Sequence, residues 1–188
     1  MNIGKQVLAQ LRLLAKEGPE AVGLQVLEHE HKTSQLLLQD TDQSVRLELF
    51  DYDRYSVTLH MLEVGTPAPA AVADTQSVLS AYAAEVAREL SYLEEPLAVW
   101  ELESREQVAQ LRSFPPLRED EEISYWEVTL TAGTEGTERS ARIMRYRWAP
   151  GMAEREVVAY PATFALIARM TDSLSSALAV VASRGHIS

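Results

Sequence analysis

Apolar residues recur at helical spacing in three stretches of the chain. The first stretch begins after Asn2, a good N-cap residue, and stops before Gly18, a typical helix-ending residue. A second stretch predicts a helix over about 72–93, and a third predicts a closing helix that begins at Pro161 and runs to about Ser183. The three stripes are Ile3, Val7, Leu11 and Leu14; Leu79, Tyr82, Val86, Leu90 and Leu93; and Phe164, Ile167, Met170 or Thr171, Leu174, Leu178 and Val181.

Between the predicted helices the period of the pattern changes to two. Val45, Leu47 and Leu49 alternate with charged residues, for example. Such alternation predicts strands with one buried face, which is typical of antiparallel sheets. The predicted strands are 22–30, 34–39, 44–50 and 55–64 before the middle helix, and 97–103, 107–113, 121–132, 138–148 and 155–159 after it.

The element order is therefore helix, four strands, helix, five strands, helix. It predicts an α+β fold in which antiparallel β-meanders pack against three helices. A chain of 188 residues is long enough for one compact domain. Two arrangements remain open: two similar subdomains, 1–93 and 94–188, or one curved sheet that grips the helices.

The stretch 121–148 carries the clearest pattern. Residues 123–131 are β-branched and aromatic, and residues 139–148 match them across a Gly-rich turn, which predicts a hairpin. A turn that closes symmetrically between Thr134 and Glu135 places Glu122 opposite Arg147 and Glu127 opposite Arg142. Cross-strand ion pairs of this kind contribute about 0.2–1 kcal/mol each and help to set the register.

The same register divides the hairpin into two apolar faces. Trp126, Val128, Leu130, Ala141 and Ile143 share one face, and Ile123 lies on the other. This second face, whose composition is typical of interface centres, has three explanations: packing within the chain, a protein partner or second copy, and a small-molecule pocket. A bulge near Arg142 would merge the two faces. The candidate binding residues on it are Tyr125, Arg142, Met144, Tyr146 and Trp148.

Composition narrows the classes of function. The chain has no cysteine, which excludes disulfides and thiolate chemistry. Its net charge is −11, and up to Glu138 ten Lys and Arg face 25 Asp and Glu. An acidic body disfavours nucleic-acid binding, because phosphate contacts require a basic surface. No apolar run approaches the length of a membrane span, and the N-terminus lacks the block order of a signal peptide, so we expect a cytoplasmic protein without membrane contact.

One weak metal-site pattern is present. His29 and His31 lie two apart, so on a strand they point in the same direction. In a meander, the turn that contains Asp51 and Asp53 falls at the same end and completes a possible site. Asp is also common in turns because of its own hydrogen bonds, and this simpler explanation is favoured.

Signatures of catalysis and cofactor binding are missing from the sequence. It contains no Gly-x-Ser-x-Gly elbow, no phosphate-binding glycine loop and no dinucleotide fingerprint. We therefore expect a non-catalytic cytosolic binding or adaptor protein, chaperone-like, that uses the aromatic and arginine face, needs no cofactor, and self-associates or binds another protein. The order of helices and meanders is similar to that of the small acidic chaperones of secretion systems, an architectural analogy that no motif supports.

An alternative is a small-molecule-binding or enzymatic domain. Its pocket would lie between the sheet and the C-terminal helix. Arg142 or Arg145 would hold an anionic group there. The aromatic lining would be Trp100, Tyr125, Tyr146 and Trp148.

Overall fold

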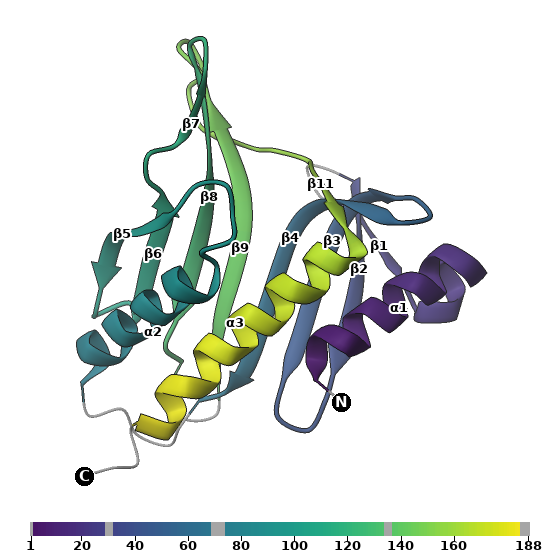
Figure 1. Cartoon of the computed structure of the whole chain (residues 1–188), viewed down its shortest axis with the longest axis horizontal. Coiled ribbons are helices and arrows are strands. Elements are labelled where there is room, and N and C mark those ends of the chain that lie inside the picture. Colours follow the sequence, from purple (N-terminus) through teal and green to yellow (C-terminus); the bar gives the residue numbers. More distant parts are fainter. Residues whose placement is uncertain (1, 29–31, 69–73, 134–136, 185–188) are drawn as a thin grey trace.

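The computed structural model describes residues 2–28, 32–68, 74–133 and 137–184. Within them the predicted α+β class is confirmed: three helices cover one face of a single large antiparallel sheet. Figure 1 shows the helices in front of the sheet, with α3 running diagonally between α1 and α2. The strands of both halves join one sheet, as the one-sheet alternative requires.

The helices begin and end where local chemistry allows. Helix α1 (Ile3–Glu17) has Asn2 as its N-cap, whose side chain accepts a hydrogen bond from the Lys5 backbone N–H, and it ends at Gly18 with a φ of 93°. A short 3-10 turn, η1 (Pro19–Val22), follows it. The backbone N–H groups at the start of α2 (Thr75–Glu89) are capped by Asp74.

The sheet order is β1-β2-β3-β4-β9-β8-β6-β5, with β7, β10 and β11 attached to its strands. Every predicted strand has a counterpart. The first half contains β1 (Gln25–Glu28), β2 (Lys32–Gln39), β3 (Ser44–Tyr52) and β4 (Ser56–Pro67). The second contains β5 (Leu97–Glu103), β6 (Val108–Ser113), β7 (Leu117–Glu119), β8 (Glu122–Thr131), β9 (Glu138–Trp148), β10 (Glu156–Val157) and β11 (Tyr160–Thr163).

The start of the closing helix corrects the sequence prediction. Pro161 is not its first residue; it lies in β11, opposite Thr58 of β4. A proline is tolerated there because β11 has a strand on one side only and needs fewer N–H donors. Helix α3 (Phe164–Arg184) begins after Thr163, whose hydroxyl accepts a hydrogen bond from the Leu166 N–H at 3.2 Å. The threonine cap outweighs the proline signal.

The centre of the sheet divides at one end. Strands β4 and β9 are paired from Pro67 and Glu138 as far as Leu62 and Ile143. Beyond that point β4 pairs with β11 and β9 pairs with β10, so the two central strands separate. Figure 1 shows β11 beside β4 at this end. The segment 149–159, which connects β9 to β11, therefore lies close to the diverging strands.

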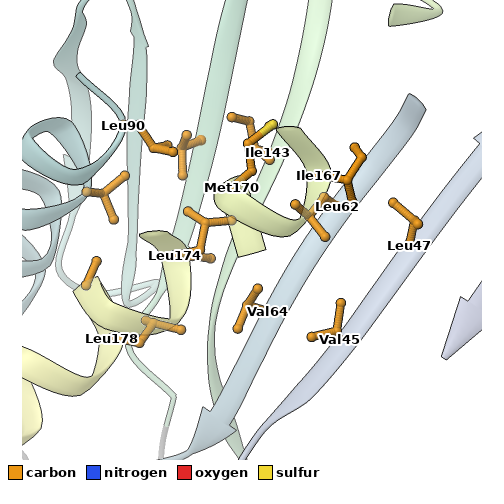
Figure 2. Packing of buried hydrophobic residues seen from close by; sticks show 14 of the residues in the cluster. Val45, Leu47, Leu62, Val64, Leu90, Ile143, Ile167, Met170, Leu174 and Leu178 are labelled. Atoms are coloured by element: carbon orange, nitrogen blue, oxygen red, sulfur yellow. The ribbon is translucent and has the colours of Figure 1, made fainter. Parts of the chain in front are cut away.

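The core fills the space between helices and sheet. In Figure 2, Met170 and Leu174 of α3 lie against Leu62 and Val64 of β4 and Ile143 of β9. The predicted residues of the α3 stripe from Phe164 to Leu178 are all buried, and the side chain of Val181 lies outside the described part of the structure. Burial of one such large side chain contributes about 1.5–3 kcal/mol.

The α-helices of the described part of the chain are not long and apolar enough to cross a membrane. The longest, α3, carries polar and charged side chains along its length.

Candidate functional site

Strands β8 and β9 form the predicted hairpin, but in a register shifted by two residues. Glu127 lies opposite Met144 rather than Arg142, so the predicted Glu127–Arg142 pair is wrong. The other predicted pair, Arg147 with Glu122, is present as a diagonal ion pair at 3.5 Å. Because side chains alternate between faces, a shift of two residues leaves each residue on its predicted face.

The two faces of this hairpin have different surroundings. Trp126 and Ile143 lie in the core beneath the helices. The opposite face is the open face of the sheet, where the rings of Tyr125 and Tyr146 stack with centroids 6.0 Å apart. All five candidate binding residues lie on this open face: Tyr125 is buried, Met144 and Tyr146 are half-buried, and Arg142 and Trp148 are exposed.

Arg145 lies on the other side, between the sheet and the helices. Its guanidinium forms two hydrogen bonds with the carboxylate of Glu95, at 3.1 and 2.9 Å, and both side chains are buried. Its charge is therefore already neutralised, which leaves Arg142 as the exposed one of the two arginines proposed to hold an anion.

A buried carboxylate organises the open face. The Glu127 side chain is only 4% exposed and contacts two arginines. Arg112, directly opposite on β6, donates from Nε to Glu127 at 2.7 Å. Arg155, from the segment after β9, makes a two-point contact with the same carboxylate. Two guanidinium groups thus share one buried acid, an arrangement with one excess positive charge.

Aromatic rings hold the same two guanidinium groups in place. Arg112 lies between Trp100 and Tyr125, at 4.7 and 5.4 Å from their ring centroids. Arg155 lies 4.0 Å from the Tyr146 centroid and donates to the Tyr125 hydroxyl at 3.2 Å. Contacts of a cation with an aromatic ring contribute about 0.5–2 kcal/mol, depending on desolvation.

The electrostatics of this cluster follow from burial and charge. Burial lowers the pKa of Arg155, but its hydrogen bonds with Glu127 and Tyr125 more than offset this and raise the pKa above its ordinary value. Burial, and then the negative charge of Glu127, raise the pKa of Tyr146. Arg155 remains a cation and Tyr146 a neutral phenol at neutral pH.

A cavity of about 530 Å³ lies beside this cluster on the open face. We call it the aromatic cavity. It combines residues of β5, β6, β7, β8 and β9 with residues of two connections, 114–116 and 153–155. Its volume is within the range of small-ligand sites. Its apolar lining includes Trp100, Phe114, Ile123, Tyr125 and Trp148, and its charged lining consists of Arg112, Arg118, Glu154 and Arg155.

A second cavity, of about 830 Å³, lies on the other side of the 153–155 segment. His60 and Met144 contribute to its lining. The His60 Nδ1 atom lies 3.1 Å from a Glu48 carboxylate oxygen. Because Ala153, Glu154 and Arg155 line both cavities, this segment forms the wall between them.

Sequence reasoning missed several residues of the aromatic cavity, among them Arg112, Phe114, Arg118, Glu154 and Arg155. Phe114 offered a signal, because it begins an apolar Phe-Pro-Pro-Leu run directly after a strand. Arg155 offered none, because its partner Glu127 lies 28 residues earlier in the chain. Trp100, Tyr125 and Trp148, which the small-molecule alternative named, do line one cavity, but it lies on the open face and not under α3.

Two of the four metal-site candidates have described structure. Asp53 accepts hydrogen bonds from the Tyr55 and Ser56 N–H groups, which lower the pKa of its carboxyl, and therefore stabilises the turn before β4. The Asp51 carboxylate accepts a hydrogen bond from the next backbone N–H. His29 and His31 lie outside the described residues. Among the residues that are described, no group of three His, Asp or Glu side chains is placed to hold a metal.

Comparison with known proteins finds no matching family model, curated protein or solved structure.

Proposed function

We propose that this protein is a binding or adaptor module that holds an apolar segment of another protein in the aromatic cavity. The observation that carries the proposal is the concentration of exposed large apolar side chains around this cavity. Trp100 is 60% exposed, Phe114 66% and Trp148 38%. Large apolar residues that gather in one place on a surface mark interaction sites more often than scattered ones do.

The types of residue also support a protein partner. Tryptophan, tyrosine and arginine are the residues that contribute most to binding energy in interface centres. Here they are arranged before any ligand arrives, because Glu127 and the stacked rings fix Arg112 and Arg155. A site whose side chains are already ordered loses less conformational entropy on binding.

The exposed apolar side chains around the cavity come from three separate elements, and this favours a polypeptide segment over a small molecule. Trp100 lies in β5, Phe114 in the connection after β6 and Trp148 in β9. One compact ligand in a cavity of about 530 Å³ would not cover three large side chains that each keep more than a third of their surface exposed. The volume itself is the observation in favour of the small-molecule alternative, and the experiment below separates the two.

The test is a selection from a random peptide library on the intact protein. Selected peptides, synthesised and titrated by calorimetry, are expected to bind the wild type and to lose about tenfold or more in affinity for a Trp100→Ser/Trp148→Ser variant, since hot-spot truncations cost 2 kcal/mol or more. Tyr55→Ser is the matched control, because Tyr55 is 69% exposed and lies outside the lining of this cavity. An unchanged melting temperature shows that the variants fold.

Two outcomes would overturn the proposal. One is a library that yields no binder, or binders that tolerate the double variant. The other is a native mass near twice 20.9 kDa that returns to the monomer value in Trp148→Glu. In that case a second copy of this chain, and not another protein, covers the aromatic cavity.

A further inference from the structure

The guanidinium of Arg112 has a fixed orientation, but only some of its hydrogen-bond donors have a partner among the described residues. Its Nε donates to Glu127, and its plane lies between Trp100 and Tyr125. Among the described residues, neither of its two Nη groups has a hydrogen-bond partner, and the side chain is 23% exposed at the aromatic cavity. A guanidinium fixed in this way presents free donors in a geometry that suits a carboxylate.

A second arginine lines the same cavity. Arg118 of β7 is exposed and forms no ion pair with any residue that the structure describes. Together with the buried Glu127, the charged lining comprises three arginines and two glutamates. The aromatic cavity therefore carries an excess positive charge in a chain whose net charge is −11. Charge complementarity points to an anionic group on the ligand.

We infer that the aromatic cavity recognises a Glu or Asp side chain next to an apolar residue in the bound segment. Arg112 and Arg118 receive the carboxylate, and Trp100, Phe114 and Trp148 receive the apolar neighbour. This inference rests on the proposed function and specifies the chemistry of the partner. The carboxylate belongs to a side chain within a segment, because the exposed apolar surface requires several consecutive residues to cover it.

The probes are tetrapeptides blocked at both ends, so that the only charge is a side chain. Ac-Leu-Phe-Glu-Leu-NH₂ carries a carboxylate, and Ac-Leu-Phe-Gln-Leu-NH₂ is its neutral isostere. The three tryptophans give the readout by ¹⁵N NMR: the indole signals of Trp100 and Trp148 report on the cavity, and Trp126, buried in the core, is an internal control.

We expect the Glu peptide to shift the Trp100 and Trp148 signals at a concentration about tenfold lower than the Gln peptide, the difference that one charge-assisted hydrogen bond supplies. Arg118→Gln should remove most of this preference, whereas Arg105→Gln, an exposed arginine outside the cavity, should not. Glu154→Gln removes the exposed acid of the lining and should strengthen binding of the Glu peptide only.

Equal binding of the two peptides would overturn the carboxylate inference and leave the proposed binding site in place. A preference only for Ac-Leu-Phe-Gln-Leu with a free C-terminus would assign the anion to a chain end, which also contradicts the inference. If no peptide shifts either signal at millimolar concentration, or if Trp126 shifts as strongly as the other two, both the inference and the proposed site fail.

Discussion

Arg155 forms a two-point ion pair with Glu127 and thereby fastens the segment after β9 to the middle of the open face. The carboxylate is almost fully buried, whereas about a third of the arginine side chain remains exposed. The same arginine separates the two open-face cavities, since it lines both. Its ion pair therefore determines both the stability of the segment and the shape of the candidate site.

Arg155→Met should lower the free energy of unfolding by about 1–3 kcal/mol, the usual effect of removing a hydrogen-bonded partner from a buried charge. Among the described residues, Glu127 would keep only Arg112 as a charged partner. Urea unfolding followed by circular dichroism measures the change. Arg147→Met is the matched control: Arg147 is 46% exposed and pairs with exposed acids, so we expect a loss of about 1 kcal/mol or less. Equal losses in the two variants would contradict the importance of the Glu127 pair.

The open face illustrates which parts of a site a sequence predicts. The faces of the β8–β9 hairpin were predictable, because alternation has a period of two and survives a register shift of two residues. The pairing of Glu127 with Arg142 was not, since the register depends on the closing turn, and the sequence leaves the closing residues open. Glu127 instead contacts Arg112, which is 15 residues earlier. Such long-range partners leave no local pattern.

At the start of α3, the sequence contained two local signals, and the proline was chosen over the correct one, the Thr163 cap. Proline is favourable as the first residue of a helix, but it is also tolerated in an edge strand, where Pro161 lies. Pairing with β4 decides between these environments, and pairing is a tertiary event. The apolar stripe of α3 was nevertheless predictable, because it starts at Phe164 and depends only on the helical period.

Gly4→Ala should destabilise the contact between α1 and α3. The Gly4 N–H donates to an Asp172 carboxylate oxygen at 2.8 Å, and an added Cβ atom would overlap both this carboxylate and the backbone oxygen of Ala168. The helices must move apart to accept the methyl group, at a cost of about 1–3 kcal/mol. Lys5→Ala, at the next and exposed position, is the control for helix propensity. A Gly4→Ala variant as stable as the wild type in urea would show that the two helices move apart freely.

Leu174→Asp should unfold the protein. Leu174 is fully buried between α3 and the sheet, so the variant would place an unpaired charge in the core (Figure 2). Ser176→Asp introduces the same residue two positions later on the exposed side of α3 and should leave the melting temperature within a few degrees. The comparison uses thermal unfolding by circular dichroism. A cooperative transition of Leu174→Asp near the wild-type temperature would refute the orientation of α3.

Stability should fall as the pH rises above about 10, because four tyrosines resist ionisation in the folded chain. Burial raises the pKa of Tyr82, Tyr92, Tyr146 and Tyr160. A pKa that is higher in the folded state means that the folded state binds the proton more tightly. This contribution is complete below the pKa of the unfolded chain and is lost as the pH rises through the folded values.

The measurement is absorbance at 295 nm, where tyrosinate absorbs, during alkaline titration of the folded chain and of the chain in guanidinium. We expect ionisation of the folded chain to occur at higher pH, with the last steps coinciding with loss of the circular dichroism signal. Tyr160→Phe retains the ring that packs edge-on against Trp126, at 4.6 Å between centroids, and removes one ionisable group. Its stability should therefore depend less on pH above 10 than that of the wild type. Coincident titration curves for the folded and unfolded chains would contradict the raised pKa values, because burial would then impose no cost on the phenolate form.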